Sequence, residues 1–395
     1  MLTLNTLIIF NESKRFIFMT IAFATVALNI HQVGVADQLY KLSNGQFWFI
    51  ETNVPNEENN KGGDADYSKR PYLIKSYESK ETYHKALQII HDADVFVYGS
   101  CPIKYFKERV KTGKLTFLYS ERWFKRGWVN MFSPRLIKQM LFYHLHCHRK
   151  PVYLLGSGGY AANDFHKMLA FRGMSYKWGY FTTVPDLDIE SVMQQKRNQI
   201  TKILWVARFI PLKHAERMVE LAAKLKVAGA KFSITMIGTG PEEESIKQMA
   251  IHQGLSDCMT FLGALPNSEV MIIMKNHHIF CFTSNRLEGW GAVVNESMGC
   301  GCCPVISIDT GAAPYLIKEG VNGFTFDLSK ENDLFDKVYW LLRHPNDREQ
   351  MSINAYRTIH DVWSPANAAA NFCKLAQSLL ADKTIQISDG PGSIA

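Results

Sequence analysis

The sequence lacks an apolar run that would cross a bilayer comfortably, which takes about 20 residues. The nearest approach is residues 14–30, KRFIFMTIAFATVALNI, where two basic residues precede a mostly apolar stretch without a convincing small-residue cleavage site. A helical pattern follows, so we expect a buried first strand that enters a helix rather than a signal peptide. Met19 lies within this stretch, and natural starts at Met1 and at Met19 both stay open.

Cysteine patterns of the kind that bind zinc or form disulfide frameworks are also missing. The eight cysteines are dispersed over 395 residues, and the neighbouring pair Cys302 and Cys303 precedes Pro304 at a spacing that fits no zinc motif. We therefore expect reduced thiols in a cytosolic protein, with Cys281 packed as a small hydrophobe in its apolar run.

Acidic side chains are scarce between Cys101 and Lys150, where twelve Lys or Arg accompany only Glu108 and Glu121. This window carries +10, whereas the whole chain carries +7. Aromatic residues interleave with the cations, so residues 104–150 predict contact with an anionic membrane surface. Nucleic acid is an alternative that we do not expect, and a partly buried aromatic core with a solvated basic rim is equally compatible. The histidines within 144–148 lack a third metal ligand at a familiar distance, which favours a basic amphipathic helix.

A chain of this length predicts two domains. Short apolar runs such as KILWVA and HIFCFT alternate with amphipathic stretches in the second half, and less cleanly in the first, as in α/β proteins with parallel sheets covered on both faces. We predict an N-terminal domain over 1–184, a C-terminal domain over 185–362, a helix over 363–382 that crosses back to the first domain, and a disordered polar tail over 383–395.

The stretch SNRLEGWGAVVNESMG, residues 284–299, follows an apolar strand and enters a helix through closely spaced glycines. Unobstructed backbone N–H groups at such a helix start suit a phosphate. Glu288 precedes this helix and Glu296 lies about two turns further on. Phosphate repels carboxylates, so both glutamates are better suited to accept hydrogen bonds from neutral hydroxyls. A ligand with central phosphates and hydroxyls at both ends is a nucleotide sugar.

From Lys202 to about Leu380 the chain resembles the family 4 glycosyltransferases, retaining enzymes of the GT-B fold with two Rossmann-like doubly wound domains facing across a cleft. Glu288 and Glu296 form a Glu-x7-Glu motif, and ILWVARFIPLKHAERMVELAAKL, MIGTGPEE, MTFLGALPNSEV and GAAPYLIKEGVNGFTFD occur in the family's order. The resemblance implies transfer of a sugar from a UDP- or GDP-sugar to a lipid-linked or growing glycan in cell-surface polysaccharide synthesis. The N-terminal domain would then bind the acceptor.

The resemblance also implies the roles of individual residues. Glu288 would contact the donor sugar, Glu296 the nucleotide ribose, and Arg208 and Lys213 the diphosphate, where their fixed charges replace a metal. No aspartate pair looks like a metal-binding motif, so we expect neither a required metal nor a cofactor. Further donor contacts are expected at the backbone of Gly289, Trp290 and Gly291, at the loop carrying Gly238 and Gly240, and at Leu262 and Gly263.

The acceptor side is predicted from strand ends in the first half. His31 stands at a helix start, and Glu121 and Arg122 directly follow an apolar strand. A histidine at such a place is more often a cap or a surface residue, and Glu121 is equally suited to neutralising its basic neighbours.

Two other classes of protein compete with a glycosyltransferase. A Rossmann-type NAD(P)-dependent oxidoreductase needs a full G-x-G-x-x-G fingerprint, but GTGPEE places Glu243 at the third glycine. A non-catalytic basic protein that binds membranes or nucleic acid would leave Glu-x7-Glu unexplained. We expect a cytoplasmic enzyme, peripheral at the inner face of the cytoplasmic membrane.

Overall fold

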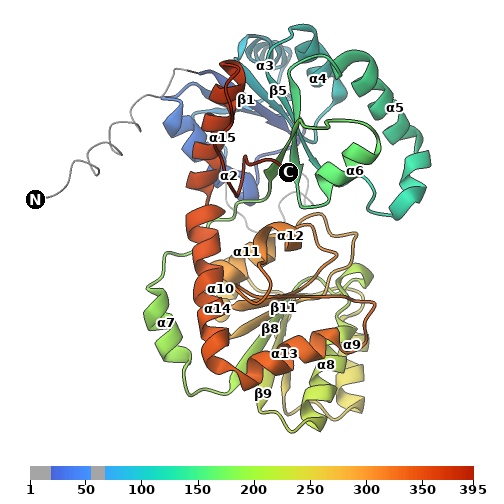
Figure 1. Cartoon of the computed structure of the whole chain (residues 1–395), viewed down its shortest axis with the longest axis vertical. Helices are drawn as coiled ribbons and strands as arrows, with labels where there is room; N and C mark the ends of the chain where they lie inside the picture. The colour runs from blue at the N-terminus through green and yellow to red at the C-terminus, as the bar shows by residue number, and fades with distance from the viewer. Residues whose placement is uncertain (1–18, 55–66) are drawn as a thin grey trace, which may run out of the picture.

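A computed structural model describes residues 19–54 and 67–395, which form two α/β domains stacked along the long axis of the molecule (Figure 1). The described part of the N-terminal domain has a seven-stranded parallel sheet of order β3-β2-β1-β4-β5-β6-β7. Its strands are β1 (Ile21–Thr25), β2 (Phe47–Glu51), β3 (Leu73–Lys75), β4 (Val95–Tyr98), β5 (Thr116–Glu121), β6 (Val152–Ser157) and β7 (Ser175–Trp178). Its helices are α2 (Ile30–Leu42), α3 (Lys80–Asp92), α4 (Ile103–Lys111), η1 (Gly127–Phe132), α5 (Pro134–Phe142), η2 (Tyr143–Cys147) and α6 (Ala161–Lys167).

The C-terminal domain has a six-stranded parallel sheet of order β10-β9-β8-β11-β12-β13. Its strands are β8 (Thr201–Val206), β9 (Phe232–Ile237), β10 (Met259–Phe261), β11 (Ile279–Phe282), β12 (Cys303–Ser307) and β13 (Phe324–Phe326). The helices from here to the end of the chain are α7 (Ile189–Lys196), η3 (Pro211–Lys213), α8 (Glu216–Val227), α9 (Glu243–His252), α10 (Asn267–Lys275), α11 (Ala292–Gly299), α12 (Ala313–Leu316), α13 (Asp333–Arg343), α14 (Pro345–Arg357), η4 (Thr358–Val362) and α15 (Pro365–Leu380).

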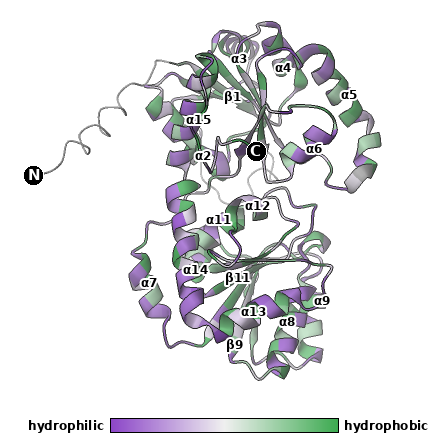
Figure 2. Cartoon of the chain, in the orientation of Figure 1, coloured by the Kyte–Doolittle hydropathy of each residue, from purple (hydrophilic) through white to green (hydrophobic). Residues whose placement is uncertain are grey.

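Both sheets are doubly wound, because the strand order reverses at the first strand of each domain. The central strands are buried on both faces, as in β1, β4 and β11, which explains their uninterrupted apolar sequences. Figure 2 shows hydrophobic residues concentrated in these strands and polar residues on the outer helices. The reversal points lie between β1 and β4 and between β8 and β11, so ligand-binding loops are expected beyond the carboxyl ends of these strands.

The first strand is buried, as the sequence predicts for residues 14–30, and Asn29 caps the helix that follows by accepting a hydrogen bond from the His31 amide. Residues before 19 lie outside the described part of the chain. All eight cysteines are free and six are buried, consistent with their interpretation as packed thiols. Within the described residues, no helix combines the length and apolar character that a membrane crossing requires.

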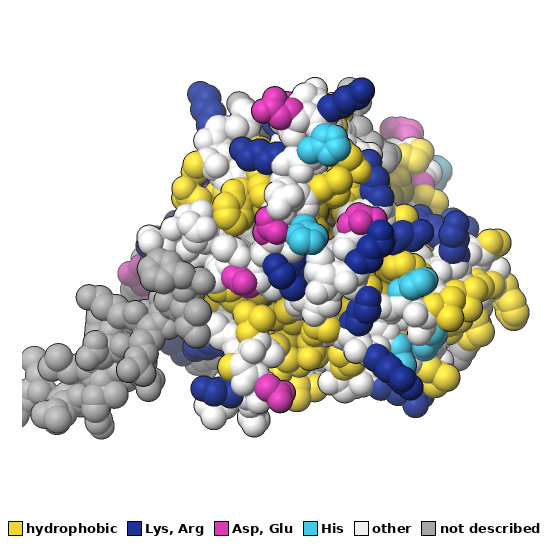
Figure 3. Space-filling view, turned by 90° about the horizontal axis from the view of Figure 1, so that it is seen from above, with side chains coloured by type: hydrophobic (Ala, Val, Ile, Leu, Met, Phe, Trp, Pro, Cys, Tyr) yellow, Lys and Arg dark blue, Asp and Glu magenta, His cyan; other side chains and the backbone are white. Residues whose placement is uncertain are grey.

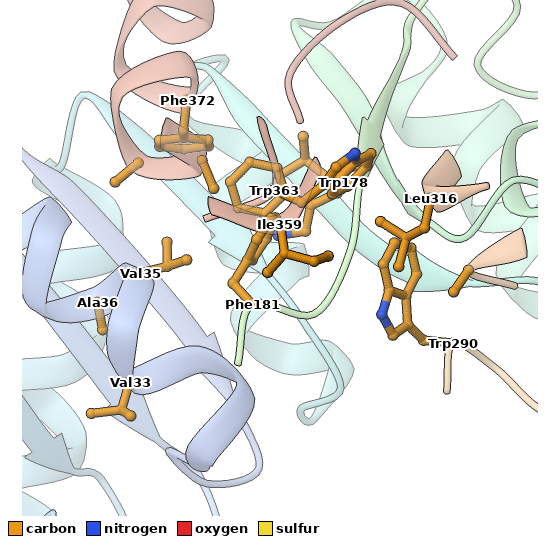
Figure 4. Close-up of a cluster of buried hydrophobic side chains, with 14 of the residues drawn as sticks. Val33, Val35, Ala36, Trp178, Phe181, Trp290, Leu316, Ile359, Trp363 and Phe372 are labelled. Carbon is orange, nitrogen blue, oxygen red and sulfur yellow. The ribbon is translucent and has the colours of Figure 1, made fainter. Parts of the chain in front are cut away.

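The chain joins the two domains twice, between β7 and α7 and again through η4 into α15. Helix α15 packs against α2, as expected for a helix that crosses back to the first domain (Figure 1). Large apolar side chains from both domains meet where the two connections pass (Figure 4), among them Trp178, Phe181, Trp290, Trp363 and Phe372. This cluster makes the domain junction part of the hydrophobic core.

The prediction of a disordered tail over 383–395 is wrong. The Lys177 amide donates to the Ser393 carbonyl and the Gly392 amide to the Lys177 carbonyl, both at 2.8 Å, and Tyr176 forms an antiparallel bridge with Ile394. Asp389 accepts from Lys177 at 3.1 Å and lies 3.4 Å from Lys318. Strand β7 is the edge of its sheet, and its unpaired backbone groups offer the polar tail the hydrogen bonds that composition alone does not reveal.

Candidate active site at the domain cleft

Two loops at the carboxyl edge of the second sheet form the base of the candidate site. One follows β8 and carries Arg208 and Lys213, and the other follows β11 and carries Glu288. The Asn285 amide donates to the Leu212 carbonyl at 2.9 Å, which ties the two loops together. Because β8 and β11 flank the reversal of strand order, these loops stand where doubly wound domains bind ligands.

The structure brings Lys213 and Glu288 into direct contact. The Lys213 ammonium donates to the Glu288 carboxylate, and both side chains are largely buried, with 13% and 18% of their surface exposed. The same ammonium lies 4.8 Å from the centre of the Phe282 ring. Arg208, in contrast, is exposed, and its side chain makes no hydrogen bond or ion pair within the described part of the chain. A diphosphate at this place would find one free guanidinium and one ammonium already fixed in position.

Helix α11 starts at this loop. Gly291 is its N-cap residue with φ of 94°, and no side chain caps the first turn. The Trp290 side chain is buried, packs against Gly179 and donates from Nε1 to Asn295 Oδ1 at 2.8 Å. Only the backbone of the Gly289–Gly291 segment is therefore left for a ligand, and first-turn amides without a side-chain cap suit an anion.

Glu296 lies inside the second domain, with 7% of its surface exposed. Its carboxylate accepts one hydrogen bond, from Asn267 Nδ2 at 3.4 Å, and has no cationic partner within the described residues. Burial raises the pKa of Glu296 from 4.5 to about 7. Two hydroxyl donors from a ribose would satisfy acceptor sites that the protein leaves open.

The unfolding free energy is expected to depend on this carboxyl. Its pKa is higher in the folded chain, so the folded state binds more protons than the unfolded state. The contribution of Glu296 to the unfolding free energy is therefore fully present below about pH 4.5 and is lost as the pH rises through about 7. Glu296→Gln keeps the acceptor for Asn267 and removes the charge. The difference in unfolding free energy between the variant and the wild type should be up to about 3 kcal/mol more favourable to the variant at pH 8 than at pH 4. Urea unfolding of both proteins at the two pH values checks this, and an equal effect at both would contradict it.

The loop of Gly238 and Gly240 lies beside Arg208. The Phe209 amide donates to the Thr239 carbonyl at 3.0 Å, and the Gly238 amide to the Gly263 carbonyl at 2.8 Å. A side chain at Gly238 would overlap the Ala207 carbonyl. The further donor contacts predicted from the sequence, including the half-exposed Leu262, thus lie on the same edge of the cleft as Arg208.

The acceptor-side prediction brings one carboxylate to the donor loop. Glu121 ends β5 and accepts hydrogen bonds from the Tyr180 hydroxyl at 2.6 Å and from Lys125 Nζ at 2.5 Å. Its carboxylate lies against Gly289, where a Cβ atom would overlap it. Glu121 therefore both pairs with a basic neighbour and faces the loop of the second domain.

The other two acceptor-side predictions differ in outcome. The His31 ring stacks on Tyr180, with centroids 5.2 Å apart and planes within 8°, and burial lowers its pKa to about 4. Its Nδ1 is buried without a hydrogen-bond partner in the described structure. Arg122 instead pairs with Asp164, Nε to Oδ2 at 3.4 Å, and is 10% exposed, so its charge is already engaged within the first domain.

The facing loops of the two domains touch directly. The Gly159 amide donates to the Gly311 carbonyl at 2.9 Å, and the Tyr160 hydroxyl donates to the Ile308 carbonyl. Arg286 donates to the Phe124 carbonyl at 3.1 Å. The structure is therefore a closed arrangement of the cleft.

Sequence reasoning missed three residues of this cleft. Tyr180 lies in the connection between the domains, where the apolar pattern lapses and no motif marks it. Asn295 lies within the Glu-x7-Glu motif but holds the protein's own backbone at Tyr180. Lys125 could have been found, because it stands four residues after Glu121 in the sequence.

Two doubly wound domains that face each other across a cleft, with an uncapped helix start between a paired carboxylate and cations, define the GT-B class of fold. Solved structures agree. The chain superposes on Anabaena HepE in complex with UDP with a TM-score of 0.66 and 14% identity, over 91% of this chain and 100% of that one. A glycosyltransferase from Rickettsia africae gives the same TM-score and identity over 92% and 99% of the two chains.

Residues 188–358 match the family described as glycosyl transferases group 1. An N-acetyl-alpha-D-glucosaminyl L-malate synthase of Bacillus anthracis is 22% identical over 180 residues, 46% of each chain. A GDP-mannose-dependent alpha-(1-6)-phosphatidylinositol monomannoside mannosyltransferase of Mycolicibacterium smegmatis is 23% identical over 199 residues, 48% of this chain and 52% of the relative. The chain thus spans about half the length of these curated relatives.

Proposed function

We propose that this protein is a glycosyltransferase that moves a sugar from a UDP- or GDP-sugar to an acceptor hydroxyl. The observation that carries the proposal is the contact of Lys213 with Glu288 beside the uncapped start of α11, with Arg208 free on the adjacent loop. The match of residues 188–358 to the group 1 glycosyl transferases and the GT-B fold support it. HepE was solved in complex with UDP, and the Mycolicibacterium relative is GDP-mannose-dependent, which favours these two bases.

In this mechanism the bond between the anomeric carbon and the β-phosphate oxygen breaks, a bond to the acceptor oxygen forms, and the acceptor hydroxyl gives up its proton to the departing diphosphate. Negative charge grows on the leaving diphosphate, where Arg208, Lys213 and the amides at the start of α11 stabilise it. Glu288 and Glu296 accept hydrogen bonds from the sugar and the ribose. Fixed cations at the diphosphate support transfer without a metal, and the resemblance to family 4 supports retention at the anomeric carbon.

Thermal unfolding with UDP, GDP, ADP, CMP or NAD(H), without added metal and with EDTA, tests the donor site. Stabilisation by UDP or GDP that weakens in Arg208→Ala is the expected result. Stabilisation by NAD(H) alone would replace the proposal with an oxidoreductase, although Glu243 at the place of the third glycine of the fingerprint argues against one. No response to any nucleotide would favour a non-catalytic binding protein.

We also propose that the acceptor is a lipid-linked or growing glycan of the cell surface, reached from the inner face of the cytoplasmic membrane. Only part of residues 104–150 is exposed enough to form the proposed membrane-binding surface. Several aromatic side chains of that window are buried, namely Tyr105, Phe106, Phe117, Phe124 and Tyr143, and Arg109 is fully buried among backbone carbonyls. They belong to the core, as in the alternative of a partly buried aromatic core with a solvated basic rim, so a membrane surface is proposed only for the exposed part of the window.

The exposed part runs from η1 through α5 to η2. Three of its apolar side chains stand in water, with Val129, Phe132 and Leu145 exposed by 76%, 77% and 74%. The segment from Arg122 to Lys150 has seven Lys or Arg, both ends counted, and no acidic residue. Figure 3 shows hydrophobic side chains with Lys, Arg and His on the side that carries α5. Apolar side chains among cations suit an anionic lipid surface.

Vesicle binding should therefore depend on both charge and apolar contact. We expect cosedimentation with vesicles of phosphatidylglycerol and phosphatidylcholine, and little with phosphatidylcholine alone. Val129→Ser with Phe132→Ser should weaken binding about tenfold or more. Val227→Ser is the matched control, because Val227 is 90% exposed on α8 of the other domain. Unchanged binding of the double variant would contradict the surface, and binding to single-stranded DNA without vesicle binding would favour the nucleic-acid alternative.

A further inference from the structure

Tyr180 occupies an unusual place between the two halves of the site. It lies in the first connection between the domains, two residues after β7 ends. Its ring stacks on His31 of the N-terminal domain and lies 6.2 Å from the ring of Trp290 in the C-terminal domain. One side chain thus contacts the acceptor side and the donor loop together.

Both ends of Tyr180 are held by hydrogen bonds. Its hydroxyl donates to Glu121 Oε1 at 2.6 Å, and its carbonyl accepts from Asn295 Nδ2 at 3.1 Å. Asn295 is fully buried on α11, and its Oδ1 accepts from Trp290 Nε1 at 2.8 Å. The first bond reaches a residue of the first domain and the second reaches the Glu-x7-Glu segment of the second.

The Tyr180 hydroxyl is suited to act as a permanent hydrogen-bond donor to the Glu121 carboxylate. Burial, followed by the negative charge of Glu121, raises the pKa of Tyr180 well above its ordinary value, so the hydroxyl keeps its proton throughout the physiological range of pH. Lys125 holds the other carboxylate oxygen at 2.5 Å. A carboxylate held at both oxygens stands in one orientation, and hydrogen bonds to charged acceptors are the stronger ones.

We propose that Tyr180 is a positioning residue that holds the Glu121 carboxylate against the donor loop and makes this placement depend on closure of the two domains. The inference rests on the proposed function, because Glu121 is the group that would meet the incoming hydroxyl. In the closed structure Tyr180 makes the Glu121 contact and the Asn295 contact at once, and on this proposal alignment of the carboxylate is linked to the position of the donor loop. Misplacement of a catalytic group by a fraction of an ångström lowers the rate while leaving donor binding intact.

Tyr180→Phe tests this directly, because the change keeps the ring that stacks on His31 and removes only the hydroxyl. The probes are UDP-glucose and GDP-mannose with water as acceptor, and the readout is release of the nucleoside diphosphate. We expect kcat to fall about tenfold, with KM for the donor and the nucleotide-induced shift in Tm unchanged. Tyr356→Phe is the matched control, since the Tyr356 hydroxyl also bonds a carboxylate, Asp186 at 3.2 Å, beside the same connection.

A double-mutant cycle separates positioning from a structural role. If Tyr180 acts through Glu121, then Tyr180→Phe combined with Glu121→Gln should be no slower than Glu121→Gln alone. Additive losses, or an unchanged kcat in Tyr180→Phe, would overturn the inference while leaving the proposed function standing. A wild-type protein that consumes neither donor would overturn the proposed function and this inference with it.

Discussion

Lys213→Met should lower turnover of the nucleotide sugar by a factor of about 100 or more, the usual effect of removing one fixed charge-stabilising group. The ammonium is largely buried and held by Glu288, so it stands in place before the donor arrives and needs no ordering during the reaction. Methionine keeps most of the packing against Phe282 and removes the charge. Nucleoside diphosphate release at saturating donor measures the effect.

The matched control is Lys226→Met, which removes an exposed ammonium on α8 that pairs with Asp257 at 2.8 Å. Its turnover should stay within about twofold of wild type, because exposed ion pairs contribute little. Equal rates for Lys213→Met and the control would remove Lys213 from the site. A large loss in donor affinity with unchanged kcat would assign Lys213 to ground-state binding only.

Gly238→Ala should reduce the free energy of unfolding by more than about 3 kcal/mol, since two costs combine there. Its φ of 133° lies outside what L side chains adopt readily, and its Cβ would overlap the Ala207 carbonyl oxygen. That oxygen belongs to the backbone of the loop leading to Arg208, so it yields only if the loop moves. The same variant should therefore also weaken nucleotide binding.

Gly229→Ala separates the two costs. Gly229 also has a positive φ, 68°, but no atom of the described chain lies within 4 Å of the position that a Cβ would take, so only backbone strain applies. We expect a loss of about 1 kcal/mol there. Urea unfolding of both variants gives the comparison, and equal losses would mean that the loop beside Arg208 yields freely.

The sequence was sufficient to predict the location of those site residues that directly follow strand ends or lie among closely spaced glycines. Lys213 and Glu288 lie 75 positions apart, yet both follow strands that flank one reversal of order, and the topology brings them into contact. The resemblance to a known family supplied their expected roles. The pattern of apolar runs was likewise sufficient for two parallel sheets.

Contacts that depend on the packing of one domain on the other could not be read in this way. Tyr180 lies where the apolar pattern of the sequence lapses and no motif marks it, and its hydroxyl bonds Glu121, which is 59 positions away. Arg122 had the position of a ligand-binding residue, but buried Asp164 pairs with it. The aromatic residues of the basic window showed no sign of which were core, because sequence shows spacing and not which face a neighbour covers.

The touching loops at Gly159 and Gly311 have a consequence for the opening of the cleft. Because the contact is made by backbone at both residues, closing the cleft there freezes no side-chain rotamers and so avoids an entropic penalty of about 1 to 2 kcal/mol for each long side chain. At this contact, opening exchanges one amide–carbonyl bond for bonds to water, at a net cost of about 1 kcal/mol. The Gly159–Gly311 contact alone therefore opposes separation of the two domains only weakly, and the side-chain contacts of Tyr160 and Arg286 supply the rest of the resistance at these facing loops.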